Sequence, residues 1–296
     1  MHDIVSFATH RSGRLRTVGL GFLLPNRWRS LGDWGADEAQ ALARMLDPLQ
    51  DCREAAARGK VFFVGDVDDS SSSPCFGFSS FQTDGRRAEP VFCGNAMAAA
   101  AALIADHTHR VRACLEVSTG AAPFRNFVTM EDLDASERRW RVHQQWRLML
   151  DTTAQAGEFL GYRSVHATFF NDYLVVDGAT VGDAAGAARR WSGMGSLRGK
   201  VVFVEPCNPP RATFVNSNGV HGAAPQTGLA TLAVLAQCVP WLAHVARAGS
   251  LVTPEGLERL PSVSLAGPAE YVIQPAAVDV HLAGVLEARH ATLQVA

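Results

Sequence analysis

The chain has 296 residues, of which 47% are hydrophobic and 19% are charged, and its formal net charge is −2. This length predicts two lobes of about 150 residues each. The balanced charge and the lack of a dense Lys/Arg run argue against nucleic acid as a partner. The lack of an apolar stretch of about 20 residues argues against a membrane span.

The six cysteines are scattered and form no C-x-x-C pair, which argues against a zinc site and against a disulfide framework. The N-terminus has no basic region followed by a long apolar core, as a targeting segment would. We therefore expect a cytoplasmic protein with reduced thiols and no bound metal.

The first third of the chain alternates between expected strands and turns. Strands are expected at residues 4–10, 18–24 and 61–64. A helix is expected at 37–50, where apolar residues follow helical spacing and the first turn contains two acidic residues. Residues 75–81 alternate with period two and predict a further strand that leads towards Cys93.

Cys93, Gly94 and Asn95 directly precede an alanine-rich run that has no charge until Asp106. This pattern predicts a buried helix with a thiol at its start. The backbone N–H groups and the dipole of a helix's first turn favour negative charge, either on a thiolate or on a bound carboxylate. Cys93 is therefore a candidate active-site residue, with a structural cysteine that caps a core helix as the alternative.

After this helix, strands are expected at residues 113–117, 126–130 and 138–150, and the last of these ends the first lobe. The second half repeats this order of elements, with strands expected at 165–170, 173–176 and 201–204 and a short helix at 184–191. A second small-residue helix then starts near Pro225 and runs to Ala236. The repetition implies an internal duplication. We expect an N-terminal lobe at 1–149 that regains a strand at about 274–296, a C-terminal lobe at 150–273, and a cleft between them.

Several motifs are similar to those of the diaminopimelate epimerase family. Phe81-Gln82-Thr83-Asp84-Gly85, followed by Phe92-Cys93-Gly94-Asn95, resembles the family's F-N-A-D-G and C-G-N-G segments. Phe170-Asn171-Asp172-Tyr173 takes the place of G-N-P-H, and residues 264–273 resemble L-T-G-P-A-E-x-V-F. The resemblance implies an α+β fold of two pseudo-symmetric lobes, in which mostly antiparallel strands wrap a central buried helix. It also implies racemase or isomerase chemistry without a cofactor.

The chain departs from this family at several functional positions. The family's second cysteine lies in A-C-G-T-G, where this chain has Ala224-Pro225-Gln226-Thr227-Gly228. Asn216 and Ser217 stand near a family E-R pair, and Lys200 replaces an asparagine. Proline cannot transfer a proton, so two-thiol racemisation is excluded and the chain is not expected to be diaminopimelate epimerase itself. The other changes suit a substrate without a free amino-acid head group.

Three hypotheses remain open. In the first, a residue of the second lobe supplies the opposite acid or base; His221 is the leading candidate, with Asp172 and Tyr173 behind it, although His221 could simply pack. In the second, Cys93 acts alone in a double-bond shift, a tautomerisation or a cyclisation. In the third, catalysis has been lost and the fold binds a small carboxylate or a protein.

The expected function is a cofactor-independent isomerase, racemase or epimerase acting on a small carboxylate or amino-acid-like substrate, with Cys93 as acid or base. The oligomeric state is left open, with a homodimer as one option. The expected substrate contacts come from both helix starts and from nearby amides; they are Gly94, Asn95, Thr227, Gly228, Gln82, Asn171, Asn216 and Gln226.

Overall fold

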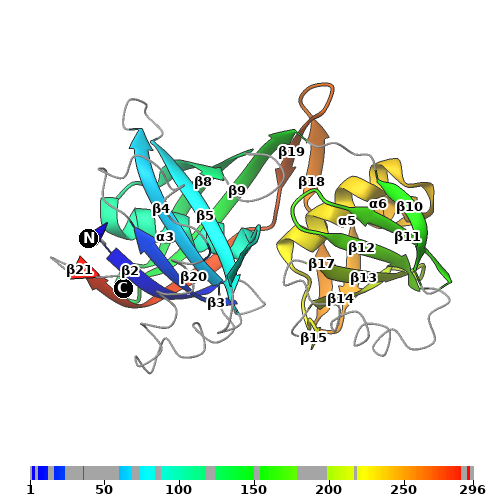
Figure 1. Ribbon diagram of the computed structural model, residues 1–296, viewed down its shortest axis with the longest axis horizontal. Helices are drawn as coiled ribbons and strands as arrows, with labels where there is room; N and C mark the ends of the chain where they lie inside the picture. The colour runs from blue at the N-terminus through cyan, green and yellow to red at the C-terminus, as the bar shows by residue number, and fades with distance from the viewer. Residues whose placement is uncertain are drawn as a thin grey trace. The chain divides into compact units, whose positions relative to one another are not determined.

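The computed structural model divides the chain into two compact units. Unit 1 contains residues 1–148 and 277–296, and unit 2 contains residues 149–276 (Figure 1). The expected helices at 37–50 and 184–191 lie outside the described residues. The structure describes residues 2–3, 6–12, 17–23, 36, 60–68, 74–83, 88–117, 124–149, 154–159, 161–178, 199–216, 219–287 and 292–293.

Unit 1 is a ring of strands around one helix. Its strands pair in the order β9-β20-β2-β3-β4-β5-β7-β8, and β8 pairs back with β9, so that the sheet closes on itself. The elements are β1 (His2–Asp3), β2 (Ser6–Ser12), β3 (Thr17–Leu23), β4 (Lys60–Asp68), β5 (Cys75–Thr83), β6 (Ala88–Pro90), α3 (Gly94–Thr108), β7 (Arg112–Val117), β8 (Phe124–Asp134), β9 (Arg139–Met149), β20 (Val278–Glu287) and β21 (Thr292–Leu293).

The helix inside unit 1 is α3, which is buried along its length from Gly94 to Ala105. It contacts β2, β3, β4, β5, β7, β8 and β20 (Figure 1). Methyl-sized alanine side chains let strands approach the helix from all round, which explains why a helix without a polar face is stable there. The surrounding strands alternate as expected: β9 buries Trp140, Val142, Gln144, Trp146 and Leu148 while the intervening side chains are more exposed.

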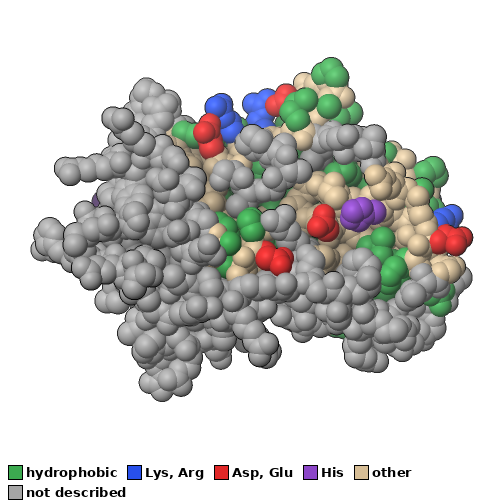
Figure 2. All heavy atoms as spheres, viewed as in Figure 1, with side chains coloured by type: hydrophobic (Ala, Val, Ile, Leu, Met, Phe, Trp, Pro, Cys, Tyr) green, Lys and Arg blue, Asp and Glu red, His purple; other side chains and the backbone are tan. Residues whose placement is uncertain are grey.

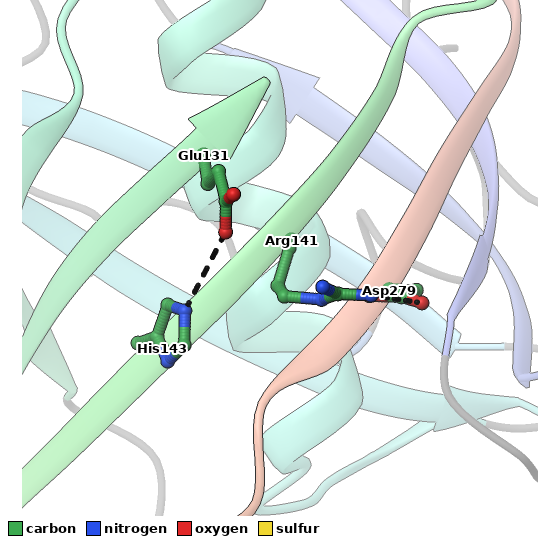
Figure 3. A network of polar contacts seen from close by, with 4 residues as sticks. All are labelled: Glu131, Arg141, His143 and Asp279. Carbon is green, nitrogen blue, oxygen red and sulfur yellow. Dashed lines mark hydrogen bonds and ion pairs between the residues drawn. The ribbon is translucent and has the colours of Figure 1, made fainter. Parts of the chain in front are cut away.

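The C-terminal strand β20 completes the ring of unit 1 by pairing with both β2 and β9. On the outer face, Arg141 of β9 lies opposite Asp279 of β20, and its guanidinium donates to the carboxylate at 2.8 and 3.2 Å (Figure 3). His143 Nε2 lies 4.0 Å from Glu131 Oε2 on the neighbouring strand β8. These exposed pairs link three strands across one surface of the sheet.

Unit 2 has a sheet in the order β10-β11-β12-β13-β14-β16-β17, on which α5 packs. A short hairpin, β18–β19, also belongs to it, and β18 contacts α5. The elements are β10 (Gln155–Phe159), β11 (Tyr162–Ala167), β12 (Tyr173–Asp177), β13 (Lys200–Glu205), β14 (Arg211–Asn216), β15 (Gly219–Val220), α5 (Gln226–Cys238), the 3₁₀ helix η4 (Pro240–Leu242), α6 (Ala243–Ala248), β16 (Ser250–Thr253), β17 (Gly256–Arg259), β18 (Ser262–Leu265) and β19 (Glu270–Gln274).

The two units repeat one pairing scheme. In unit 1, β2-β3-β4-β5-β6-α3-β7-β8 pair antiparallel except for the parallel pairs β3–β4 and β5–β7. In unit 2, β11-β12-β13-β14-β15-α5-β16-β17 follow the same order, with β12–β13 and β14–β16 parallel. The predicted α+β fold of two pseudo-symmetric, mostly antiparallel lobes with a buried helix each is confirmed.

The described surface carries mixed charge. On the face in Figure 2, the coloured Lys/Arg and Asp/Glu side chains stand singly or in small mixed groups. Over the described ranges, no single helix is long and apolar enough to cross a membrane; α5 and the segment Pro240–Ala248 reach that composition only as a pair bent by 116°. The same ranges contain no cluster of three His, Cys, Asp or Glu side chains suited to a metal ion.

Candidate functional site

Cys93 is the N-cap residue of α3. Its backbone is extended, with φ −139° and ψ 107°, and its Sγ accepts a hydrogen bond from the Ala96 N–H at 3.4 Å. The Cys93 carbonyl accepts the first helical bond, from the Met97 N–H at 3.0 Å. The side chain is half-buried, and the first turn of α3 contains no acidic residue. The thiol is thus held among the N–H groups of the helix start, where a negative charge is favoured.

The segment that delivers Cys93 is fixed from both sides. Ser80 of β5 donates from its buried hydroxyl to the Val91 carbonyl at 2.6 Å and accepts the Val91 N–H at its own carbonyl at 2.9 Å. Phe92 packs its ring against Phe124 and Trp146, with ring centroids 4.8 and 5.1 Å apart. Backbone hydrogen bonds and aromatic packing therefore position the residues immediately before the thiol.

A buried polar network holds the first turn of α3 against the sheet. Gln144 of β9 donates to the Gly94 carbonyl at 3.2 Å, and its side-chain oxygen accepts hydrogen bonds from Asn126 at 2.9 Å and from Trp146 at 3.3 Å. The Asn126 amide also contacts Met97 Sδ at 3.5 Å. Asn126 and Trp146 are completely buried and Gln144 nearly so. Buried networks of this kind restrict the local conformation.

Helix α5 begins in the same way but with a different residue at its start. Pro225 is its N-cap, with φ −62° and ψ 139°, and its carbonyl accepts the Leu229 N–H at 3.0 Å. The helix predicted to start near Pro225 begins at Gln226, because the backbone of Pro225 itself is extended rather than helical. Pro225 instead occupies the place that Cys93 holds in α3, and it offers neither an acidic side chain nor an N–H.

The first turn of α5 gathers several of the predicted contact residues. Thr227 Oγ1 lies 2.7 Å from the Tyr173 hydroxyl and accepts from the Asn171 amide at 3.4 Å. The hydroxyl of Thr231 donates to the Thr227 carbonyl at 2.8 Å. A Cβ at Gly228 would stand 2.5 Å from the Phe214 ring and 3.3 Å from the Tyr173 hydroxyl. Packing alone therefore accounts for the glycine, while Thr227 and Asn171 form a buried polar group.

The remaining predicted residues are more dispersed. Gln226 donates from its side chain to the Ala276 carbonyl at 3.0 Å, and Gln82 accepts from the Lys60 ammonium. Asn216 ends β14 opposite Gly219. His221 is half-buried on the segment before α5, where its backbone N–H donates to the Phe214 carbonyl at 2.8 Å.

Asn95 is buried in the first turn of α3, beside Gly94. Gln82, Asn95 and Cys93 therefore belong to unit 1, whereas Thr227, Asn171 and His221 belong to unit 2.

Two features could not be predicted from the motifs: the contact of Lys60 with Gln82, and a pair of facing cysteines. Lys60, the first residue of β4, donates a hydrogen bond from its ammonium to the side-chain oxygen of Gln82. Cys75 and Cys114 lie directly opposite each other on β5 and β7. Burial and the neighbouring Cys114 thiol raise the pKa of Cys75 to about 12. Burial raises the pKa of Cys114 as well.

The fold recurs among solved structures of epimerases and isomerases. A protein described as a predicted epimerase from Pseudomonas aeruginosa is 11% identical over 97% of this chain and 99% of its own, with a TM-score of 0.55. A hydroxyproline epimerase from Agrobacterium vitis, solved with trans-4-hydroxy-L-proline, is 15% identical over 97% and 93% of the two chains, with a TM-score of 0.52. A methylitaconate-delta-isomerase is 11% identical over 100% and 99%, with a TM-score of 0.56.

No protein-family model and no curated protein matches the sequence. At these identities the likeness to the solved structures is one of fold. The predicted resemblance to the diaminopimelate epimerase-like group is therefore confirmed for the fold, which this chain shares with epimerases and isomerases.

Proposed function

We propose that this protein is a cofactor-independent isomerase that moves a proton on a small carboxylate, with Cys93 as the acid or base. One observation carries the proposal: the half-buried Cys93 thiol caps α3, with its Sγ hydrogen-bonded to the Ala96 N–H. A structural cysteine could fill a gap in the core without standing at a helix start. The fold shared with epimerases and isomerases supports the same reaction class.

The proposed reaction needs a base, a group that stabilises negative charge, and an acid at the start of α3. The thiolate takes a proton from a carbon next to the carboxylate, and the electron pair left behind moves onto the carboxylate oxygens. The helix N-terminus favours that developing negative charge. The thiol then returns a proton to the same carbon or to a conjugated one, so that no atoms or electrons are gained or lost.

The proposed substrate contacts follow the two helix starts. In unit 1 they are Gly94, Asn95 and Gln82. In unit 2 they are Thr227, Gly228, Asn171, Asn216 and Gln226. The polar group of Thr227, Asn171 and Tyr173 supports the unit 2 assignment, because buried hydroxyl and amide groups at a helix start suit recognition of a carboxylate.

A one-cysteine version of the reaction is favoured by Pro225. It stands at the N-cap of α5, the position equivalent to Cys93, and it cannot exchange a proton. A double-bond shift, tautomerisation or cyclisation needs acid/base chemistry from only one thiol. A racemase version needs a second group from unit 2, for which His221 is the candidate.

The experiment is solvent deuterium incorporation. The purified protein is incubated in D2O with a panel of small carboxylates and amino acids, and the products are followed by proton NMR. We expect Cys93→Ala to lose at least 99% of the incorporation while its circular dichroism is unchanged. Cys207→Ala, at an exposed cysteine, is the matched control and should keep full activity.

The position of the deuterium separates the two versions. Label at an α-carbon with loss of optical activity supports the racemase, and His221→Ala should then abolish turnover. Label at a conjugated carbon with a moved double bond supports the one-cysteine isomerase, and His221→Ala should then retain turnover. Full incorporation by Cys93→Ala would refute both.

A further inference from the structure

Two cysteines of unit 1 face each other across neighbouring strands. Cys75 begins β5 and Cys114 lies in β7, and the two are direct partners in the parallel pairing of these strands. The Cys114 backbone N–H donates to the Pro74 carbonyl at 2.9 Å, which fixes the register beside the pair. Both thiols are free in the structure, and the function proposed for Cys93 uses neither of them.

The geometry of the two strands suits a disulfide between these cysteines. Neighbouring strands lie about 4.8 Å apart, and side chains of direct partners in a parallel pair project to the same face of the sheet. A disulfide joins residues whose Cα atoms are about 4.4–6.8 Å apart, so the link fits this spacing. Besides the effect of burial, each thiol shifts the pKa of the other. Such a mutual effect requires that the two side chains lie close together.

The cysteine pair lies on the outer face of the ring of strands. The next pair along β5 and β7 is Phe76 and Leu115, which are almost completely buried and face the core. Glu116, two residues beyond Cys114, shares its face because side chains alternate along a strand, and it is exposed. Cys75 is half-buried, whereas Cys114 is only 4% exposed. A small oxidant therefore reaches Cys75 first.

The surroundings of the pair make its chemistry slow at neutral pH. Burial is the main cause of the raised pKa of both thiols, Glu116 adds to it, and Arg125 opposes it at Cys114. Glu116 and Arg125 are themselves an ion pair at 2.9 Å. Because the thiolate is the attacking species, oxidation is slow where the thiol form dominates. A disulfide is slow to open as well, since thiolates of high pKa are poor leaving groups.

A link between these residues closes a loop that contains the whole of α3. From Cys75 the chain runs through β5, β6 and α3 into β7, where it reaches Cys114. Cys93, at the start of α3, lies inside that loop. A covalent link at the base of a loop restricts the unfolded chain and holds the two strands together. Oxidation therefore ties together the two ends of the segment that carries Cys93.

We propose that Cys75 and Cys114 are a redox site, at which a small-molecule disulfide such as oxidised glutathione reacts first with Cys75 and leaves an intramolecular Cys75–Cys114 disulfide. The proposal is independent of the reaction assigned to Cys93.

The reaction consists of two thiol–disulfide exchanges. The Cys75 thiolate attacks one sulfur of oxidised glutathione, forms a mixed disulfide and expels one glutathione thiolate. The Cys114 thiolate then attacks Cys75 Sγ and expels the second glutathione. In total the two cysteines lose two electrons and two protons, and the oxidant is reduced to two molecules of glutathione.

Peptide mapping of the unmodified protein tests the link. The reduced protein is incubated with excess oxidised glutathione at mildly alkaline pH, the remaining thiols are alkylated, and the protein is digested with trypsin. Cleavage after Lys and Arg gives peptides 61–86 and 113–125, each with one cysteine, and separates both from the peptide 88–110 that contains Cys93. We expect the 61–86 and 113–125 peptides to be joined in more than half of the protein.

The same digest contains the control for the oxidant. Cys207 is exposed and should carry glutathione. If Cys207 is modified while less than half of Cys114 is linked to Cys75, the proposal is overturned. The incubation is repeated in urea, where we expect the yield of this link to fall at least about threefold because the strands no longer align the thiols. An equal yield in urea would also overturn the proposal, because the fold would then not direct the pairing.

Two variants test the order of the steps. Cys114→Ala should stop at a mixed disulfide of glutathione on Cys75, whereas Cys75→Ala should leave the buried Cys114 unmodified. Glutathione on Cys114 in Cys75→Ala would overturn the order assigned to the two cysteines. Since the link itself is read in the unmodified protein, that result stands even if a variant fails to fold.

Discussion

At the scale of single residues, Cys75 and Cys114 differ from Cys93 in their surroundings. They face each other across the parallel pair β5–β7, and Glu116 of β7 lies close to both. Desolvation raises the pKa of each thiol, and the pKa of Cys75 reaches about 12. A raised pKa keeps a thiol protonated, so this pair is held in its unreactive form at neutral pH.

The raised pKa of Cys75 predicts a loss of stability in alkali. Its pKa in the folded protein, about 12, lies above the ordinary value of 9.0, so the folded state favours the protonated thiol. That contribution is complete below pH 9 and is lost as the pH rises towards 12. We expect the urea midpoint of the unmodified protein to fall between pH 9 and about pH 11, and to fall less in Cys75→Ala. Cys207→Ala, at an exposed cysteine, should follow the unmodified protein; an equal fall in all three proteins would contradict the assignment.

At the scale of elements, the two buried helices are fixed by different means. The start of α3 is held by side-chain hydrogen bonds from the sheet, through Gln144 and Asn126. The start of α5 also has side-chain hydrogen bonds, through Thr227, and in addition it is closely packed, since Gly228 leaves no room between its backbone and the Phe214 ring. A substitution at Gln144 should therefore act through hydrogen bonding, and one at Gly228 through packing.

Gln144→Met tests the network under α3. The substitution preserves volume but leaves the buried Asn126 amide and Trp146 N–H without their acceptor, and it removes the donor to Gly94. Unsatisfied buried polar groups cost about 1–3 kcal/mol each, so we expect a loss of about 2–4 kcal/mol in the free energy of unfolding. Gln145→Met, on the same strand but half-buried, should change it by less than about 0.5 kcal/mol in the same urea titration.

Gly228→Ala tests the packing of α5. Alanine normally favours a helix over glycine by about 1 kcal/mol, but the new Cβ would stand 2.5 Å from a Phe214 ring atom. Overpacking of this kind typically costs about 1–3 kcal/mol, so the melting temperature should fall. Gly157→Ala is the control, because its Cβ would meet only the Ser164 hydroxyl at 3.8 Å. A melting temperature unchanged in Gly228→Ala would show that the ring moves aside without cost.

At the scale of the whole molecule, unit 1 depends on a strand that is distant in sequence. β20 pairs with β2 and β9, contacts α3, and buries Val278, Val280 and Leu282. The exposed pair Arg141–Asp279 adds at most about 1 kcal/mol. The apolar side chains of β20 therefore contribute most of what holds it in place.

Removal of residues 277–296 should unfold unit 1. Each of the three buried side chains contributes about 1.5–3 kcal/mol, and their sum approaches the whole stability of a typical domain. We expect rapid proteolysis within residues 1–148 and loss of the tryptophan near-ultraviolet circular dichroism. A chain ending at Glu287 keeps β20 and should resist the protease. Equal resistance of both truncated chains would contradict the role assigned to this strand.

Much of this architecture could be predicted from local patterns. Period-two alternation marks β8 and β9, and the uncharged alanine run marks α3 as buried, because both signals lie within one element. The network of Gln144, Asn126 and Gly94 could not be predicted, since its members are far apart in sequence and polar residues give no sign of burial. The predicted role of Gln226 likewise took no account of its bond to Ala276.

The interrupted course of unit 1 has a consequence during synthesis. Its ring-closing strand, β20, leaves the ribosome only after the 128 residues of unit 2 have been made. At typical bacterial and eukaryotic translation rates this interval is roughly 10 s. Throughout it, β2 and β9 both lack the strand that joins them and closes the ring around α3. Unit 2 can therefore fold first, and the nascent N-terminal half is the form of this protein that most needs a chaperone.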